Sequence, residues 1–247
     1  MTAGKLPPIH LWGIDAPLEP LSGGHRNAVF RTSELSRDLV FKSTRRDEAQ
    51  IRWLSPVLGA AQAAGLSVAA PIPALDGRYV AEGWTCEPLI EGRPFQPDEL
   101  PQIAERIDAF HAATTSLPQR PGFAAAHDLL AMDSGGDVTL SALPVELAQL
   151  CRKAWQGLAG SDGPDSPNGV IHGDLTAGNL IHSETGPALL DWDEARVDHR
   201  AFDLIRTHPA DATAAQKTAA LAWEVACSWE IEPEHARIVA RVLERRI

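Results

Sequence analysis

Three polar residues in the later half of the chain have the types and the spacing that phosphoryl transfer needs. Asp174 is followed five residues later by Asn179, and Asp191 comes twelve residues after that, directly behind the apolar stretch 188–190. When a phosphoryl group moves from ATP to an alcohol, one carboxylate meets the acceptor hydroxyl and takes its proton. An amide oxygen and a second carboxylate hold magnesium against the phosphates, and magnesium prefers such hard oxygen ligands. The spacing therefore predicts a phosphotransferase site.

These residues belong to a longer motif. The chain reads His-Gly-Asp-Leu-Thr-Ala-Gly-Asn over 172–179 and Leu-Leu-Asp-Trp-Asp over 189–193. The pattern resembles the aminoglycoside phosphotransferase and choline kinase-like enzymes, which are small-molecule kinases. The resemblance covers residues 20–115 and 168–207. It implies that Asp174 is the catalytic base, that Asn179 and Asp191 bind Mg²⁺, and that ATP or GTP is the co-substrate. The alternative is an acidic loop that matches the motif by chance.

A glycine turn near the N-terminus fits a phosphate-binding loop. Glycines let the backbone close over phosphates, and bare N–H groups can donate to them. A Gly-Gly turn on its own is equally typical of an ordinary hairpin. The residues that we expect to bind nucleotide here are Ser22, Gly23, Gly24 and Asn27.

Lys42, one of four lysines in the chain, ends the strand that follows this turn. A compact ammonium suits the α- and β-phosphates, and the resemblance implies that Glu48 pairs with Lys42. A carboxylate at a helix N-terminus is also favoured by the helix dipole alone, and Asp47 would serve that purpose equally well.

Residues 86–92 resemble the segment at which the family holds adenine by backbone groups. Pro88 has no N–H, so Leu89 and Ile90 are the better candidates for adenine contacts. We expect His111 to pack or to make a buried hydrogen bond, and we expect His172 to order the loop rather than to act as a base. The resemblance also implies that Asp203 braces the catalytic loop.

The elements that must position these residues follow from the apolar patterns. We expect strands over 28–32, 39–42, 78–84 and 85–88, and one helix from Asp47 to Gly65 that Pro56 interrupts. The later part is mainly helical, over 100–111, 145–158 and from 214 onward with a break at Pro233. Short strands at 170–171 and 188–190 flank the motif, and 119–145 reads as irregular.

This pattern, with the resemblance, predicts an α+β, protein-kinase-like bilobal fold. A small N-terminal lobe with an antiparallel sheet, residues 1–90, would bind the nucleotide. A larger, mainly helical lobe, residues 91–247, would carry the catalytic residues and the acceptor.

Composition excludes several other classes. The net charge is −11, and all of it arises in residues 91–247. Nucleic acid and anionic membranes attract clustered basic residues, so neither is an expected partner. The three cysteines have no CxxC spacing, no apolar run of 18 residues exists, and residues 1–10 do not read as a signal peptide. We therefore expect a cytoplasmic protein with reduced thiols. The sequence leaves its oligomeric state open.

The acceptor is the least determined part of the hypothesis. The acidic later lobe favours a small polar acceptor that is cationic or an amino sugar, although acidity also serves solubility alone. An indole face and a carboxylate, from Trp223, Cys227 and Glu230 on one helix face, could hold an ammonium. The alternatives are that Trp223 packs in the core, or that the acidic residues of the pocket are Asp128, Asp133 and Asp137.

Two other readings remain open. A nucleotide-binding regulatory protein without turnover is disfavoured, because Lys42, Asp174, Asn179 and Asp191 are all present. A protein kinase is disfavoured because no Ala-Pro-Glu-like segment and no long activation loop follow Asp191.

Overall fold

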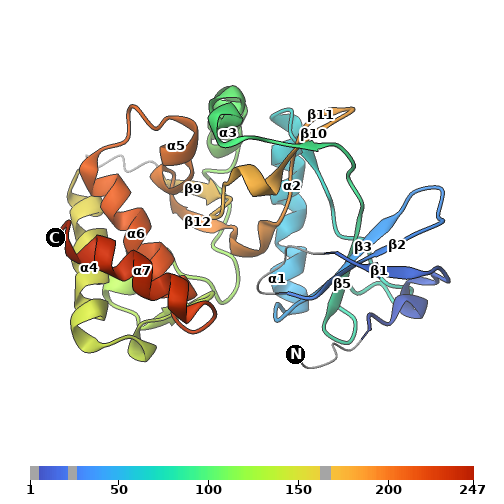
Figure 1. Cartoon of the computed structure of the whole chain (residues 1–247), viewed down its shortest axis with the longest axis horizontal. Helices are drawn as coiled ribbons and strands as arrows, with labels where there is room; N and C mark the ends of the chain where they lie inside the picture. Colours follow the sequence, from blue (N-terminus) through green and yellow to red (C-terminus); the bar gives the residue numbers. More distant parts are fainter. Residues whose placement is uncertain (1–5, 22–26, 162–167) are drawn as a thin grey trace. The chain divides into compact units, whose positions relative to one another are not determined.

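The computed structural model describes residues 6–21, 27–161 and 168–247, which form two compact units (Figure 1). The first unit contains Met1–Pro94 and Leu180–Leu190, and the second contains Phe95–Asn179 and Asp191–Ile247. The first unit therefore includes a hairpin, residues 180–190, that the sequence analysis placed in the later lobe.

An antiparallel sheet forms the centre of the first unit. Its strands are β1 (Leu18–Pro20), β2 (Val29–Thr32), β3 (Leu39–Ser43) and β5 (Trp84–Pro88), in the order β1-β2-β3-β5. The inward side chains of Phe41, Trp84 and Cys86 pack with Trp12 from the short 3-10 helix η1 (Ile9–Trp12). The strand expected at 78–84 does not form. Only Ala81 bridges to Trp84, because Glu82 and Gly83 turn the chain with positive φ.

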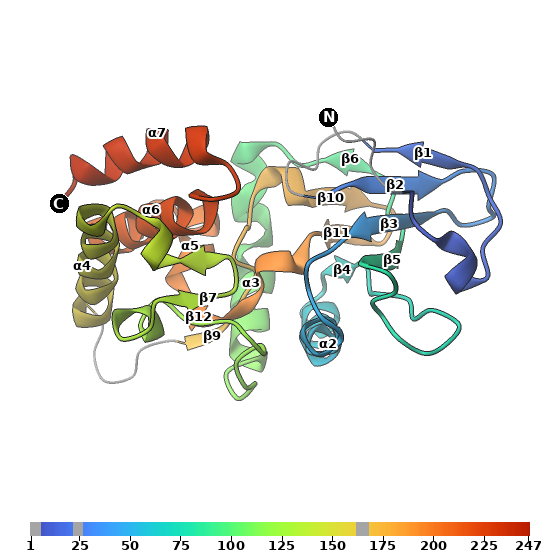
Figure 2. The same ribbon diagram turned by 90° about the horizontal axis from the view of Figure 1, so that it is seen from below.

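A second sheet explains why residues 180–190 belong to this unit. Strands β10 (Leu180–Ser183) and β11 (Gly186–Leu189) form an antiparallel hairpin. The hairpin lies between β4 (Ser67–Val68), which pairs with β11 in parallel, and β6 (Arg93–Pro94), which pairs with β10 (Figure 2). The apolar stretch that precedes Asp191 is thus a strand, as predicted, and it ends at Leu189.

The helix expected over 47–65 is two helices, α1 (Glu48–Arg52) and α2 (Leu54–Ala63). The break lies three residues before Pro56, because proline has no N–H for the carbonyl of Arg52 and its ring crowds that carbonyl. Asp47 caps α1 by accepting from the Gln50 N–H at 2.8 Å. Every apolar residue that predicted the helix is buried: Ile51, Leu54, Val57, Leu58 and Ala61.

The second unit is mainly helical. Its helices are η2 (Pro97–Ile103), α3 (Ala104–Ala113), α4 (Val145–Ser161), α5 (Ala201–Thr207), α6 (Ala214–Ser228) and α7 (Pro233–Glu244). Helix α6 packs between α4 and α7 (Figure 1). The segment before α3 is a 3-10 helix that contains Pro101. The predicted break at Pro233 is confirmed, since α7 begins there.

Short elements connect these helices. Strand β9 (Asn168–Ile171) pairs antiparallel with β12 (Arg196–His199), and this pair carries the motif residues between its strands. The segment 119–145 is more ordered than its composition suggested. It contains η3 (Asp128–Leu130), a hairpin of β7 (Ser134–Gly135) and β8 (Val138–Thr139), and η4 (Leu140–Ala142).

All three cysteines are buried, and none of them forms a disulfide bond. Burial raises the pKa of the thiols of Cys86 and Cys151 to about 12, so both are protonated at neutral pH. Within the described ranges, no helix has the length and hydropathy to cross a bilayer.

Candidate active site

The loop after β9 is held in place by one buried carboxylate. The backbone N–H groups of His172 and Gly173 donate to Asp203 Oδ2 at 2.7 Å and Oδ1 at 3.1 Å. His111 Nε2 lies 3.1 Å from the same Oδ2, and the side chains of His111 and Asp203 are at most 1% exposed. The sequence analysis expected Asp203 to brace this loop and His111 to make a buried hydrogen bond, and both expectations are confirmed.

The charge state of Asp203 follows from these contacts. Burial acts to raise the pKa of its carboxyl group. The hydrogen bond with His111, the electrostatic interactions with the His111 and His172 side chains, and the His172 N–H outweigh burial and hold the pKa below its usual value. Asp203 is therefore ionised at neutral pH and can accept both backbone donors of the loop.

Asp174 and Asn179 form one hydrogen-bonded turn at the end of this loop. Asp174 is exposed, and its N–H donates to His172 Nδ1 at 3.3 Å. Asn179 ends the 3-10 turn η5 (Ala177–Asn179), and its Nδ2 donates to Asp174 O and to Asp174 Oδ2, both at 2.9 Å. The hydrogen-bond network sets this orientation of the Asn179 amide. It leaves Asn179 Oδ1 available to a metal ion and Asp174 Oδ1 available to the hydroxyl of an acceptor substrate.

Asp191 belongs to the same unit as Asp174 and begins the second segment of the motif. Its backbone is left-handed, with φ +60° and ψ +67°, and it precedes the 3-10 turn η6 (Trp192–Glu194). The buried ring of Trp192 packs edge-on against His172, with ring centroids 4.8 Å apart, and against Phe110 at 5.5 Å. The segment that carries Asp191 is therefore packed directly on the loop that carries Asp174.

These residues fit a magnesium ion shared with phosphates. Asn179 Oδ1 and the Asp191 carboxylate are hard oxygen donors of the kind that Mg²⁺ prefers. Among the described residues, no cluster of three or more His, Cys, Asp or Glu side chains could hold a metal alone. Two protein ligands would suit Mg²⁺, because this ion keeps several waters and takes phosphate oxygens.

The first unit holds the candidate nucleotide residues. Lys42 lies near the end of β3, opposite Val29 and Thr85 in neighbouring strands, and is half-buried. Glu48 accepts the N–H groups of Tyr79 and Val80 at 2.9 and 3.0 Å. It also forms an ion pair with Arg52 at 2.7 Å. The Glu48 carboxylate is thus anchored at the start of α1. Asn27 lies two residues before the start of β2, and Ser22, Gly23 and Gly24 lie outside the described residues.

The two candidates for adenine contact differ in their backbone donors. The N–H of Leu89 donates to the carbonyl of Asp38 at 2.9 Å, which continues the pairing of β3 with β5. Its amide is therefore used within the protein. In the described part of the chain, the N–H of Ile90 has no partner, so Ile90 is the donor that a purine can take.

The ammonium pocket that Trp223, Cys227 and Glu230 could form on one helix face is wrong, and the alternative, that Trp223 packs in the core, is confirmed. Trp223 is 6% exposed and belongs to the core of the second unit. The guanidinium of Arg196 covers its ring, 3.4 Å from the centroid, so this indole face is already occupied by a cation. Glu230 lies beyond the end of α6, and Cys227 is buried.

The alternative acidic residues are also engaged locally. Asp133 forms an ion pair with Arg152 at 2.6 Å. Asp128 accepts the N–H of Ala125 at 2.9 Å and lies 3.0 Å from His127. Asp137 lies between β7 and β8.

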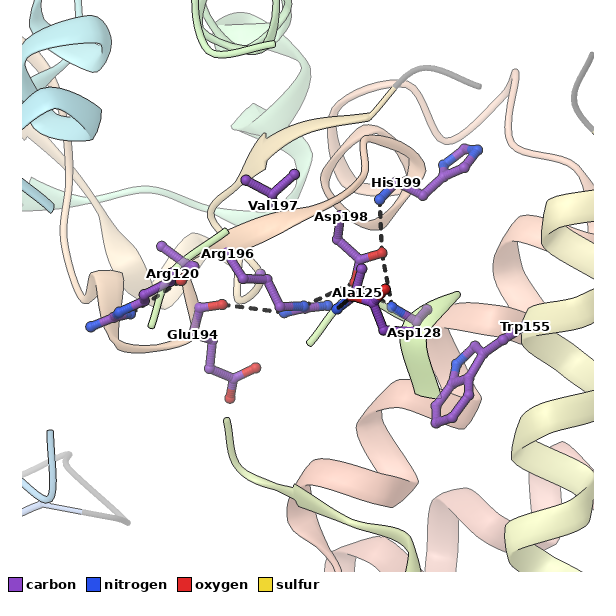
Figure 3. A network of polar contacts seen from close by, with 12 residues as sticks. Arg120, Ala125, Asp128, Trp155, Glu194, Arg196, Val197, Asp198 and His199 are labelled. Carbon is purple, nitrogen blue, oxygen red and sulfur yellow. Dashed lines mark hydrogen bonds and ion pairs between the residues drawn. The ribbon is translucent and has the colours of Figure 1, made fainter. Parts of the chain in front are cut away.

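The sequence analysis missed two buried arginines, Arg120 and Arg196, each 1% exposed. Their guanidinium groups contact the segment that follows Asp191 (Figure 3). No local pattern marks Arg120, because it lies in a stretch of Gln and Pro between elements. For Arg196, the sequence signal was its spacing from Asp198. Residues i and i+2 lie on the same face of a strand, so this spacing indicates that the two side chains can pair.

Solved structures of small-molecule kinases share this fold. A microcompartment-associated aminopropanol kinase is 15% identical, with a TM-score of 0.66, covering 96% of this chain and 93% of that one. The amicoumacin kinase hAmiN, in complex with AMP-PNP, Ca²⁺ and Ami, is 12% identical, with a TM-score of 0.65 and coverages of 93% and 87%.

A thermostable mutant of the aminoglycoside phosphotransferase APH(4)-Ia, in a ternary complex with AMP-PNP and hygromycin B, is 14% identical. Its TM-score is 0.65, and the match covers 96% of this chain and 95% of that one. These likenesses confirm the α+β, protein-kinase-like fold. No curated protein matches the sequence.

The sequence profile of the phosphotransferase enzyme family, APH, matches residues 17–236. This range includes the turn of Asp174 and Asn179, the segment of Asp191 and the carboxylate of Asp203 that braces the loop. The chain belongs to the APH phosphotransferase enzyme family and is a small-molecule kinase.

Proposed function

We propose that this protein transfers the γ-phosphoryl group of ATP or GTP to a hydroxyl of a small, amine-bearing acceptor in the cytoplasm. The observation that carries the proposal is the turn in which Asn179 donates twice to Asp174. That turn lies on a loop braced by Asp203 and packed against the segment of Asp191.

The chemistry divides among the residues of the second unit. Asp174 Oδ1 accepts a hydrogen bond from the acceptor hydroxyl and takes its proton as the oxygen–phosphorus bond forms. The bond from the γ-phosphorus to the leaving diphosphate oxygen breaks, and ADP or GDP departs. Asn179 Oδ1 and Asp191 would hold Mg²⁺, which when bound neutralises charge on the phosphates.

The first unit supplies the nucleotide contacts in this proposal. Lys42 pairs with the α- and β-phosphates, and the anchored Glu48 carboxylate holds its ammonium in place. The amide of Ile90 donates to the purine. Ser22, Gly23, Gly24 and Asn27 are the further candidates for phosphate contacts, from their residue types in the sequence.

An amine-bearing acceptor is supported by charge and by likeness. Residues 91–247 carry the whole net charge of −11, which favours a cation over an anion. The similar structures include an aminopropanol kinase and an aminoglycoside phosphotransferase, and aminopropanol carries both an amine and an alcohol.

The test is nucleotide consumption with an acceptor panel. Purified protein with Mg²⁺ and either ATP or GTP is incubated with amino alcohols, choline, amino sugars and aminoglycosides, and diphosphate release is measured. We expect release that depends on one class of amine-bearing acceptor and that is absent in Asp174→Ala. Tight nucleotide binding with no acceptor-dependent release across the panel would instead indicate a regulatory nucleotide-binding protein.

A further inference from the structure

The segment that follows Asp191 is held by a buried arginine from a distant part of the chain. Nη1 of Arg120 donates to three main-chain carbonyls, at 3.1, 3.0 and 3.1 Å. The acceptors are the carbonyl oxygens of Trp192, Asp193 and Ala195. This nitrogen carries two hydrogens, so at least one hydrogen is shared between two of the three carbonyls. The guanidinium also stacks on the ring of Phe123, 4.5 Å from its centroid.

A second buried arginine takes the remaining carbonyl of this segment. Nη1 of Arg196 donates to the Glu194 carbonyl at 3.2 Å, as Figure 3 shows. Its Nε donates to Asp198 Oδ2 at 2.9 Å, and both side chains are 1% exposed. Between them, Arg120 and Arg196 therefore bind all four carbonyls of residues 192–195.

Arg196 also connects this segment to the catalytic loop and to the helical core. A Cβ atom at Gly173 would lie 2.9 Å from Arg196 Nη1 and 2.7 Å from the Glu194 carbonyl, so only glycine fits there. On its other side, Arg196 lies over the rings of Trp223 at 3.4 Å and Phe202 at 5.5 Å. The guanidinium thus lies between the residue before Asp174 and the packed faces of α5 and α6.

These contacts matter because Asp191 has a left-handed backbone conformation, which costs free energy for a residue other than glycine. A non-glycine residue in the left-handed region is retained only where its surroundings hold it. The turn η6 has three residues, so most of its carbonyls lack partners within the turn. The arginine donors fix those carbonyls, and with them the peptide planes that follow Asp191.

We propose that Arg120 and Arg196 are positioning residues that clamp residues 192–195 and so hold the Asp191 carboxylate in its metal-binding orientation. This inference rests on the proposed role of Asp191 in binding Mg²⁺. Groups that orient a metal ligand typically contribute about 10- to 100-fold to metal affinity.

The experiment measures metal-dependent nucleotide binding, which needs neither turnover nor a known acceptor. AMP-PNP is titrated into the full-length protein by calorimetry, in EDTA and at increasing Mg²⁺ concentration, and thermal unfolding is recorded in parallel. The variants are Arg120→Met, which keeps bulk and removes every donor, and Arg120→Lys, which keeps the charge but loses the planar group of donors.

Arg152→Met is the matched control. Arg152 also donates to main-chain carbonyls, those of Leu129 and Met132 at 3.1 and 3.2 Å, and it pairs with Asp133 away from the motif segments. Its replacement removes an arginine that binds carbonyls in the same unit without touching residues 191–195.

We expect Arg120→Met to raise the Mg²⁺ concentration at half-saturation at least 10-fold, with AMP-PNP affinity in EDTA unchanged. Arg120→Lys should lie between this variant and wild type. Arg152→Met should lower the unfolding temperature without changing the Mg²⁺ dependence.

Two contrary results are distinguishable. If wild type binds AMP-PNP equally in Mg²⁺ and EDTA, the proposed metal site fails, and the clamp inference fails with it. If wild type is Mg²⁺-dependent and Asp191→Asn abolishes that dependence, but Arg120→Met keeps the wild-type value, only the clamp is overturned. Should Arg120→Met not fold, Arg120→Lys decides by the same criterion.

Discussion

At the scale of single residues, the turn of Asp174 and Asn179 divides one carboxylate between two tasks. Oδ2 accepts from Asn179 Nδ2, so this oxygen fixes the orientation of the side chain. Oδ1 has no partner among the described residues, so it is the oxygen that we propose as the proton acceptor. In the proposed mechanism, the two oxygens of this carboxylate therefore have different tasks.

Replacing Asp174 tests this division. We expect Asp174→Ala to lower kcat by roughly 10²- to 10⁴-fold, because the acceptor hydroxyl loses its proton acceptor. Affinity for AMP-PNP should stay close to wild type. Asp174→Asn is the matched control, since it keeps an oxygen for Asn179 but cannot take a proton. If it retained near wild-type kcat, Asp174 would not be the base.

Asp191 allows a substitution that separates charge from backbone conformation. Asparagine tolerates the left-handed region about as well as aspartate does, so Asp191→Asn should fold with an unchanged unfolding temperature. The neutral amide is a weaker ligand for Mg²⁺, and we expect Mg²⁺-dependent AMP-PNP binding and turnover to fall below detection. Calorimetry and thermal unfolding give the two readouts. Wild-type metal dependence in this variant would contradict the assignment.

At the scale of elements, β9, α3 and α5 meet at one buried carboxylate. Asp203, in the first turn of α5, accepts the first two N–H groups after β9, while His111 reaches it from α3. The catalytic loop therefore takes its shape from the relative positions of these three elements rather than from its own residues alone.

Asp203→Asn should destabilise the protein in a pH-dependent way. An amide presents a donor where two backbone donors need acceptors, so we expect a loss of about 1–3 kcal/mol in the free energy of unfolding at pH 7. The folded pKa of Asp203 lies below the unfolded value of about 3.9, so its stabilisation is present above that value and is lost as pH falls through the folded pKa.

The two proteins should therefore converge in stability as the pH falls below about 4. Urea unfolding at pH 7 and at a series of lower pH values measures the difference. Asp108→Asn is the control, because Asp108 is half exposed and lies 3.6 Å from His208, also near a histidine. We expect it to change the stability by about 0–1 kcal/mol. A pH-independent difference for Asp203→Asn would show that Asp203 is not ionised in the folded protein.

At the scale of the whole molecule, the charge is unevenly distributed along the chain. Residues 1–90 carry nine basic and nine acidic residues, whereas residues 91–247 carry 13 and 24. Because the pairs Arg152–Asp133 and Arg196–Asp198 neutralise single sites only, the field of the later part stays negative. Such a field attracts a cationic acceptor over distances larger than a hydrogen bond.

This attraction should weaken with salt. The screening length falls from about 10 Å at 0.1 M to about 3 Å at 1 M ionic strength. We expect KM for an amine-bearing acceptor to rise severalfold between low salt and about 0.5 M, while KM for a neutral analogue stays constant. Steady-state kinetics at constant Mg²⁺ measures both. Equal efficiency for the two acceptors, with no salt dependence, would leave solubility as the only role of the acidity.

Local patterns predicted much of the fold because they reflect burial on one face. The spacing of Ile51, Leu54 and Val57 predicted a helix, and all three are buried. The prediction of a strand at 78–84 is wrong. Ala81 and Trp84 are buried on either side of a turn, and the alternating pattern of buried and exposed residues in a strand does not apply there. The interruption expected from Pro56 is confirmed, and it lies at Trp53 because proline acts on the carbonyl four residues before it.

The candidate site was predictable where chemistry requires a residue type at a fixed spacing. Asp174, Asn179 and Asp191 stand out because a base and two oxygen ligands must come from short, defined segments. The environment of Trp223 was not predictable in this way. The apolar spacing of a helix indicates that a side chain is packed, but it does not indicate which residue packs on it. Its partner is Arg196, which follows from the pairing of β12 with β9 and not from the helix.

The sequence by itself determined the reaction class, the family resemblance and the residues of the motif, because these depend on residue type and short-range order. Only the tertiary structure decided that β10 and β11 join the first unit through β4 and β6, that the Leu89 amide is used by Asp38, and that Arg120 binds the segment after Asp191. Each of these depends on hydrogen bonds between groups far apart in the chain, and no local pattern encodes which distant carbonyl a donor will meet.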